Sequence, residues 1–203
     1  MIYLDAAATA PTRPEILETV WPLLTTQFGN PSSRHELGEQ AGRALDYARE
    51  TAARALGVRP GDIVFTSGGT ESNNLAIRGL ALANPRGRHL VRTAVEHSSV
   101  AGAMDHLAAH HGFAVDTVPV DRAGRIDPEA LRPVLLTDTT LESDIAVNNE
   151  VGTIQPVAEA AGAAHAVGAL FHTDAVQAAG WLDLVPLAAV SDALSVSGHK
   201  AGG

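Results

Sequence analysis

Apolar residues along this chain recur at two spacings, one typical of helices and the other of buried strands. Within residues 38–56, alanine and leucine return every three or four positions and therefore share one face of a helix. Gly57 follows at a position where glycine commonly ends a helix. Short apolar runs such as residues 89–93 lie between the helical segments and predict strands. The pattern predicts helices and strands in alternation.

The predicted elements together define a fold class. The expected helices span residues 14–25, 38–56, 70–83, 99–109, 128–135 and 157–167. The expected strands span residues 62–66, 89–93, 113–118, 145–147, 169–173 and 193–196. Strands separated by helices of this length imply right-handed crossovers and a mostly parallel sheet. We therefore expect a three-layer α/β fold with helices flanking the sheet, and ligands at the carboxyl ends of its strands.

The composition limits the kinds of protein and partner that fit this chain. The chain has 203 residues, enough for one well-buried domain, which we expect to span residues 1–203. Apolar residues make up 45% and aromatic residues only 4%, a balance that suits small side chains packed between helices and a sheet. The formal charge of −9 argues against nucleic acid or an anionic membrane as a partner.

Some kinds of site and location do not fit the sequence. It contains no cysteine, which excludes disulfides and cysteine-ligated metals. His106 and His110 have the i, i+4 spacing of metal ligands, but no third ligand stands nearby, and we expect no metal site. No apolar run is long enough to cross a bilayer, and residues 1–5 lack the features of a signal peptide. We expect a cytoplasmic protein.

A glycine-rich loop, Ser67-Gly68-Gly69-Thr70, joins an expected strand to an expected helix. Its glycines allow backbone amides to approach a ligand, and the helix N-terminus offers free N–H groups and partial positive charge to a phosphate. Thr70 adds a hydroxyl donor. The spacing is neither that of a Walker A loop nor G-x-G-x-x-G. A βα turn capped by Ser67 or Thr70 explains the loop equally well.

Polar groups also follow three other expected strands. His97 can stack on a planar cofactor and move protons near neutral pH. Asn149, close to Gly152, can bind a phenolic oxygen or a carboxylate, although paired asparagines are also ordinary in turns. Asp174 ends a strand, and Gln177 stands one helical turn later. A carboxylate at that position can keep a pyridinium nitrogen protonated, or it can cap a helix.

The position of Lys200 favours the interpretation of these polar groups as one cofactor site over their interpretation as separate helix caps and turns. It follows an apolar run, with Ser197 and His199 directly before it. A lysine in low-dielectric surroundings loses its proton more readily and can form a Schiff base with an aldehyde. An isolated S-G-H-K sequence would indicate an ordinary solvated loop. Together with Asp174 and the Thr70 loop, Lys200 predicts a site for pyridoxal 5′-phosphate.

These groups belong to a longer series of motifs that runs through essentially the whole chain. In order, the series is Tyr3-Leu4-Asp5-Ala6-Ala7-Ala8-Thr9, Phe28-Gly29-Asn30-Pro31-Ser32-Ser33, the Thr70 loop, Glu96-His97, Asn148-Asn149-Glu150-Val151-Gly152, Asp174 and Ser197-Gly198-His199-Lys200. The series resembles the cysteine desulfurase family of class V, fold-type I pyridoxal phosphate enzymes. The resemblance implies the large domain of that fold.

The resemblance implies catalytic roles for Lys200 and His97. Lys200 would hold the cofactor as a Schiff base and move protons at the α-carbon of the substrate. His97 would stack over the pyridine ring and assist acid–base steps. Asp174 would keep the ring nitrogen protonated.

The remaining roles implied by the resemblance concern binding. Thr70, Ser197 and His199 would contribute to the phosphate cup, beside Lys200. Gln177 and Asn149 would approach the phenolic oxygen, and Asn149 would also meet the substrate carboxylate. The implied reaction converts L-cysteine to L-alanine and passes sulfur through an enzyme persulfide to an acceptor protein, such as an iron–sulfur scaffold. A homodimer is also implied.

Two departures from the family pattern shape the expectation. The family's sulfur-accepting cysteine, its substrate-carboxylate arginine and its small domain lie in a C-terminal half that does not appear in this sequence. We therefore expect the large-domain portion of a longer enzyme, truncated at the C-terminus and inactive alone. Residues 140–145 also carry Glu142 and Asp144 where the family has an almost wholly apolar strand. Since burying two unpaired carboxylates is costly, we expect this segment to be shifted, frayed or atypical.

Alternative functions share many of the same residues. A selenocysteine lyase, or another class V lyase or aminotransferase, would keep the ring-binding set. A non-catalytic remnant could retain the fold for dimerisation or binding alone. A cysteine on a mobile loop in the missing segment would favour the desulfurase.

Overall fold

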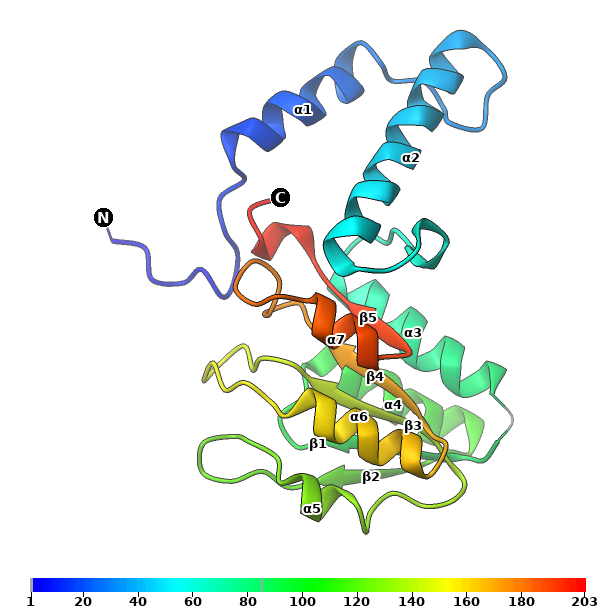
Figure 1. Cartoon of the computed structure of the whole chain (residues 1–203), viewed down its shortest axis with the longest axis vertical. Helices are drawn as coiled ribbons and strands as arrows, with labels where there is room; N and C mark the ends of the chain where they lie inside the picture. The colour runs from blue at the N-terminus through cyan, green and yellow to red at the C-terminus, as the bar shows by residue number, and fades with distance from the viewer. Residues whose placement is uncertain (1, 85) are drawn as a thin grey trace.

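The protein alternates helices and strands, as the apolar pattern predicts (Figure 1). The computed structural model describes residues 2–84 and 86–203. The helices are α1 (Pro14–Thr25), α2 (Glu36–Leu56), α3 (Gly69–Ala83), α4 (Ser98–His111), α5 (Pro128–Leu131), α6 (Val157–Ala166) and α7 (Val185–Val190), with short 3₁₀ turns at Pro60–Asp62 and Gly198–Lys200. The strands are β1 (His89–Thr93), β2 (Ala114–Val118), β3 (Thr139–Ile145), β4 (Leu170–Asp174) and β5 (Ala193–Ser195).

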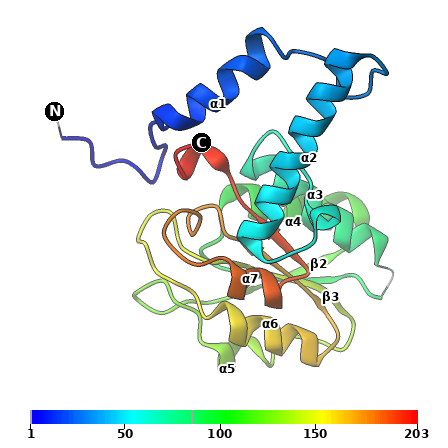
Figure 2. The ribbon, with the colours of Figure 1, turned by 45° about the horizontal axis from the view of Figure 1, so that its top comes forward.

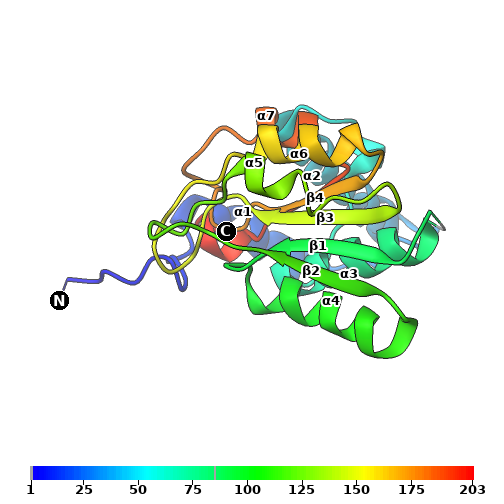
Figure 3. The same ribbon diagram turned by 90° about the horizontal axis from the view of Figure 1, so that it is seen from below.

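The five strands form one sheet in the order β2-β1-β3-β4-β5, and every pair is parallel. Figure 3 shows α5, α6 and α7 on one side of this sheet and α3 and α4 on the other. The expected three-layer α/β fold is therefore confirmed. Because all strands run in the same direction, their carboxyl ends lie along one edge, where ligands bind in folds of this kind.

Each face of the sheet has its own apolar core. On one side, Leu90 and Leu141 pack with residues of α3 and α4, among them Met104 and Leu107. On the other side, alanines of α6 pack on the sheet around Phe171. The abundance of alanine lets α6 approach the strands closely, so a chain with few aromatic residues still buries a continuous core.

The first two helices lie outside these layers (Figures 1 and 2). Helix α1 has the bounds predicted from the sequence, yet it buries no residue. Helix α2 buries only Gly38 and Ala53. It ends at Gly57, which has a φ of 68° in the left-handed region, as expected for a glycine at a helix end. None of the described helices is long and apolar enough to cross a membrane.

The strand expected at residues 62–66 is wrong. The 3₁₀ turn Pro60–Asp62 is followed by extended chain that pairs with no strand. A cavity of about 1120 Å³ is lined both by this segment and by residues of β5, so the two do not meet as neighbours in the sheet. Arg49 holds the segment instead, since its guanidinium donates to the carbonyl of Ile63 and lies over the ring of Phe65.

The strand expected at residues 145–147 is shifted. Strand β3 covers Thr139–Ile145 and is buried along its whole length. It lies at the centre of the sheet between β1 and β4, and backbone pairing on both sides fixes its position. The carboxylate-bearing segment is therefore neither frayed nor displaced from the core.

Glu142 and Asp144 are consequently fully buried on the face that packs against α6. The register partners of Glu142 are Val91 and Phe171, both members of the apolar core on that face. Outside the pair, none of the four carboxyl oxygens has a hydrogen-bond partner among the described residues, whereas a protonated Glu142 can donate to Asp144. Burial raises the pKa of Glu142 well above its usual value and raises that of Asp144 to about 6.

The helix expected at 128–135 is only half present, because α5 ends at Leu131. The strands expected at 113–118, 169–173 and 193–196 need smaller corrections, and each is moved or shortened by one residue. Helix ends commonly fray, and a sheet register depends on pairing that a single strand's sequence does not contain.

Candidate active site

The carboxyl ends of β3 and β4 and the loop after β5 surround a pocket of about 270 Å³. All eight residues predicted from the sequence line this pocket: Thr70, His97, Asn149, Asp174, Gln177, Ser197, His199 and Lys200. They come from five different segments, which the parallel sheet brings to one edge. The structure therefore places these residues around one pocket, and their roles stay predictions.

Asp174 closes β4 at the floor of the pocket and is 3% exposed. One carboxylate oxygen, Oδ1, accepts the backbone N–H of Val176 at 3.0 Å. Among the described residues a turn and not a helix follows Asp174, so this bond stabilises a turn and the helix cap considered from the sequence is wrong. The other oxygen, Oδ2, accepts from the amide of Asn73 at 2.7 Å. Asp174 therefore stabilises the turn and is also held in one orientation within the pocket.

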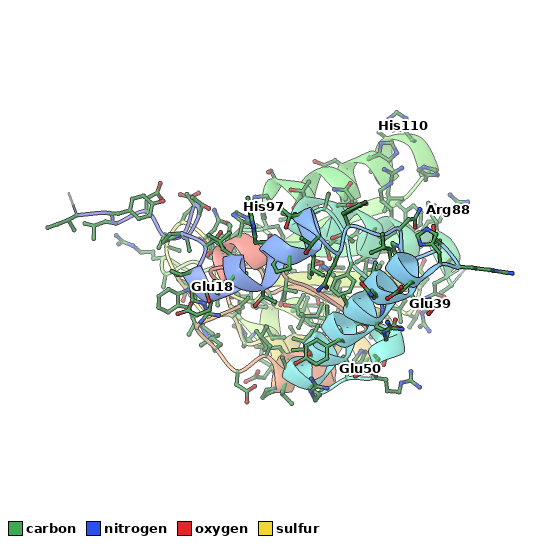
Figure 4. The ribbon with its side chains drawn as sticks, turned by 90° about the horizontal axis from the view of Figure 1, so that it is seen from above. Glu18, Glu39, Glu50, Arg88, His97 and His110 are labelled. Atoms are coloured by element: carbon green, nitrogen blue, oxygen red, sulfur yellow. The ribbon has the colours of Figure 1, made fainter. Side chains whose placement is uncertain are left out.

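His97 caps the N-terminus of α4 and lines the pocket. Its Nδ1 accepts the backbone N–H of Ser99 at 3.1 Å and lies 2.7 Å from the Ser99 hydroxyl. Figure 4 shows His97 and His110 at opposite ends of α4. The ring of His110 packs against that of His106, 4.6 Å away between centroids, and neither of those two lines the pocket.

The two adjacent asparagines have different surroundings. Asn148 is buried and fixes the turn, because its Oδ1 accepts the backbone N–H groups of Glu150 and Val151. Its amide donates to the carbonyl of Val95 at 3.0 Å. Asn149 is only partly buried and lines the pocket, with its amide 2.9 Å from a carboxylate oxygen of Glu150. Asn148 is thus the structural member of the pair, and Asn149 is the member available to a ligand.

One end of the pocket offers hydrogen-bond donors. Helix α3 begins at Gly69, and a Cβ atom at Gly69 would lie 2.8 Å from a methyl group of Val176. Only glycine allows the helix to begin this close to the loop after β4. Thr70 and Ser197 add hydroxyl groups, and His199 adds an imidazole. Helix N–H groups, hydroxyls and an imidazole are suitable donors to a phosphate.

The N-terminal segment forms a further wall and joins the last residues of the chain. The amide of Gln177 donates to the carbonyl of Ala7 at 2.8 Å. Thr9 lies 3.3 Å from the ring of His199, and the backbone N–H of Ala10 donates to the carbonyl of His199. Figures 1 and 2 both show the C-terminus beside the segment that leads into α1. Gln177 and His199 thus bind this segment as well as lining the pocket.

A buried polar chain lies below the pocket on the α3 side of the sheet. His172 links the hydroxyls of Ser143 and Ser195, at 2.8 Å and 3.1 Å, and Ser195 lies 2.9 Å from the hydroxyl of Ser72. Burial lowers the pKa of His172 to about 4, although the charge of Asp174 acts in the opposite direction. The neutral imidazole can therefore accept at one ring nitrogen and donate at the other, and hold β3, β4 and β5 in register.

Two polar side chains of the pocket were given no role in the sequence analysis. Asn73 and Ser99 line it and are 1% and 8% exposed. Asn73 follows the Thr70 loop by three residues, and Ser99 follows His97 by two. Their signal in the sequence was this spacing, which places them on the first turns of α3 and α4 beside residues that were identified.

The matches with known proteins agree with this geometry. A model of the aminotransferase class-V family matches residues 2–203, and the chain belongs to this family. It is 44% identical over 200 residues to cysteine desulfurase IscS of Dictyoglomus turgidum, and 46% identical over 205 residues to the NifS/IcsS protein homolog of Lactobacillus delbrueckii. Both alignments cover 98% of this chain, and they cover 50% and 52% of those relatives. The chain spans about half the length of the curated relatives it matches.

Solved structures show the same correspondence. A NifS-like protein superposes with a TM-score of 0.95 at 37% identity, over 100% of this chain and 56% of the other. A structure described as SspA in complex with cysteine superposes with a TM-score of 0.94 at 37% identity, over 100% of this chain and 58% of the other. The fold of the described residues is therefore that of NifS-like proteins.

Pyridoxal 5′-phosphate is the cofactor of the class-V family, and the donors and charges of this pocket fit it. The phosphate donors around Thr70 and the fixed carboxylate of Asp174 both line the pocket. Lys200 lies on the pocket wall and is the only lysine among the 203 residues. An amine, a carboxylate and a phosphate cup are the three features that an aldehyde-bearing pyridine phosphate requires.

Proposed function

We propose that the protein carrying this chain is a cysteine desulfurase, which converts L-cysteine to L-alanine and transfers the sulfur to an acceptor. The observation that carries the proposal is the arrangement of Lys200, Asp174 and the α3 N-terminus around one pocket. Relatives described as cysteine desulfurases, at 44% and 45% identity, support the choice of reaction within the class-V family.

Each pocket residue has a distinct task in this proposal. The bound cofactor supplies an aldehyde that joins an amine and a ring that withdraws electrons from the α-carbon of the amino acid. Lys200 holds the cofactor through its Nζ atom and afterwards moves the proton at the substrate α-carbon. Asp174 holds a proton at the ring nitrogen, which keeps the ring electron-poor. His97 covers the ring face and assists proton transfer.

The remaining residues bind and orient. Thr70, Ser197 and His199 hold the phosphate through hydroxyl and imidazole donors. Asn149 and Gln177 orient the phenolic oxygen, and Asn149 also meets the substrate carboxylate. The hydrogen bond from Gln177 to the carbonyl of Ala7 holds the N-terminal segment at this side of the pocket.

Borohydride trapping is expected to attach the cofactor to Lys200. The full-length protein is loaded with pyridoxal 5′-phosphate, reduced with borohydride, digested and mapped by mass spectrometry. The reduced adduct should appear on the peptide that contains Lys200 and be absent from a Lys200→Arg variant with the same far-ultraviolet spectrum. An adduct on another amine, or none in a cofactor-saturated sample, would rule out this site.

Product analysis separates the proposal from its rivals. A desulfurase forms alanine and, with a reductant present, sulfide from L-cysteine over many turnovers. A selenocysteine lyase prefers selenocysteine, and another class V lyase or aminotransferase gives different products. A non-catalytic remnant binds the cofactor and forms no product. Because the 203 residues contain no cysteine, a persulfide must be carried by a thiol outside them.

The proposal extends to partners and location. We propose a homodimer, as the resemblance implies, and a sulfur-acceptor protein such as an iron–sulfur scaffold. A cytoplasmic location suits a chain without cysteine and with a formal charge of −9. Sedimentation of the full-length protein tests the dimer.

A further inference from the structure

Asn73 and Ser99 connect two groups of the pocket that the proposed function treats separately. Asn73 lies on α3 and Ser99 on α4, between Asp174 on β4 and His97. The Nδ2 atom of Asn73 is 2.7 Å from Oδ2 of Asp174 and 2.9 Å from the hydroxyl of Ser99. That hydroxyl is in turn 2.7 Å from Nδ1 of His97. Three short hydrogen bonds thus lead from the carboxylate to the imidazole.

The carboxylate sets the direction of the first link. A carboxylate accepts hydrogen bonds and donates none, so Asn73 must face Asp174 with its NH₂ group rather than its carbonyl. The same NH₂ group has a second hydrogen, which it donates to the Ser99 oxygen. The carbonyl oxygen of Asn73 is buried without a partner among the described residues. This orientation of the Asn73 side chain leaves its carbonyl oxygen without a hydrogen bond. It is kept because the Asp174 carboxylate can only accept, and therefore needs the NH₂ group to face it.

The direction of the hydrogen bond at Ser99 in turn determines whether Nδ1 of His97 donates or accepts. Since the Ser99 oxygen accepts from Asn73, its own hydrogen is available for Nδ1 of His97. The backbone N–H of Ser99 points to the same ring nitrogen at 3.1 Å. Two donors therefore face Nδ1, which must accept. In the neutral ring the proton is on Nε2, which makes no hydrogen bond with the described residues and is left for a ligand in the pocket.

We infer that Asn73 and Ser99 are positioning residues, which form a directional relay from Asp174 to His97 and fix the proton of His97 on Nε2. The relay holds the group at the cofactor ring nitrogen and the group at the ring face in one relative orientation. It also presents an N–H donor of His97 to the substrate. The part that concerns catalysis rests on the proposed function, whereas the orientation of His97 is a property of the chain itself.

A double-mutant experiment tests the relay without any cofactor. The full-length protein is labelled with [¹⁵N]histidine, and the ring resonances of His97 are assigned by their loss in His97→Gln. At a pH where the ring is neutral, NMR should show Nε2 protonated and Nδ1 unprotonated. Asp174→Asn should shift the Nδ1 resonance, because it removes the charge that orients Asn73. In a Ser99→Ala background the same replacement should produce no such shift.

The controls separate the relay from a general disturbance. Ser98→Ala removes an exposed neighbouring hydroxyl and should leave the effect of Asp174→Asn unchanged. Ser99→Thr keeps the hydroxyl and should restore the coupling. Asn73→Ala breaks the relay at a second point and serves if Ser99→Ala fails to fold. A shift of equal size with and without the Ser99 hydroxyl would show that the charge acts through space, and the relay would be wrong. No shift in the wild-type background would also overturn it.

Kinetics give an independent readout. Ser99→Ala should lower kcat with cysteine about tenfold and change KM little, as expected for the loss of one positioning hydrogen bond. Ser98→Ala should change neither. If trapping at Lys200 fails but the NMR coupling is present, the proposed function is wrong and the relay remains. If Lys200 is labelled but the coupling is absent, the relay alone is wrong.

Discussion

Replacing Glu142 with methionine and Asp144 with valine is expected to raise the free energy of unfolding at pH 7 by on the order of 4 kcal/mol. Both carboxyls are fully buried in the central strand, and among the described residues neither has a hydrogen-bond partner outside the pair. Apolar side chains of similar volume remove the desolvation cost and fill the same space. Urea unfolding of the wild type and the double variant measures the difference.

The same replacement should change how stability depends on pH. The pKa of Asp144 rises on folding from about 3.8 to about 6, and that of Glu142 also rises. Below about pH 3.8 both states are protonated and the pair costs no ionisation energy. As the pH increases toward 6 and beyond, the unfolded chain releases protons that the folded chain retains, so the wild type loses stability. The double variant should lack most of this loss.

A surface carboxylate provides the control for this result. Glu18 is exposed on α1 and is labelled in Figure 4. Glu18→Met should change the free energy of unfolding by less than about 0.5 kcal/mol, both at pH 7 and at acidic pH. Some pH dependence should persist in the double variant, because burial also raises the pKa of Glu96. An unfolding free energy equal to or below that of the wild type would show that the two carboxyls have donors in solution.

Asp174→Ala is expected to lower turnover of cysteine by on the order of a hundredfold in the full-length protein while the cofactor stays bound. The phosphate donors and Lys200 are unchanged, so the anchor remains. The ring nitrogen loses its charge partner, and the ring withdraws electrons less well. Steady-state kinetics together with cofactor content per chain measure both effects.

Asp183 offers a closely matched control. It accepts the backbone N–H of Val185 at 3.0 Å, the same interaction that Asp174 makes with Val176 at 3.0 Å. Asp183 does not line the pocket. Asp183→Ala should therefore lose a comparable backbone hydrogen bond without loss of turnover. If both variants keep near-normal turnover and cofactor content, Asp174 only stabilises its turn and has no role in the chemistry.

The pocket could be predicted from the sequence because its residues follow strands of a parallel sheet. Polar groups such as Asp174 and Lys200 each stand after an apolar run, and parallel strands bring such positions to one edge. Asn73 and Ser99 could not be found in this way. Buried asparagine and serine near a helix start have the same sequence pattern as exposed caps, and only the fold shows that α3 and α4 bring them within 2.9 Å.

The errors in the strand predictions have a common physical cause. Residues 63–66 have the composition of a strand, but a strand exists only where a neighbour completes its hydrogen bonds. Glu142 and Asp144 argued against a buried strand, yet pairing of β3 with both β1 and β4 fixes the segment at the centre of the sheet. Hydrogen bonding to a strand on each side stabilises β3 by more than the burial of the two carboxyls costs. The sequence of one segment does not reveal which strands pair with it.

The wall formed by the two ends of the chain also sets an order of events during synthesis. Thr9 contacts His199, a residue 190 positions later, and Lys200 follows directly. At ribosomal speeds of about 5–20 residues per second, the N-terminal segment emerges roughly 10–40 seconds before its partner is made. Throughout that time the hydrogen bonds that join Thr9 and Ala10 to His199 cannot form, and Lys200 has not yet been made. Retention of a cofactor through Lys200 can therefore begin only after translation has passed that residue.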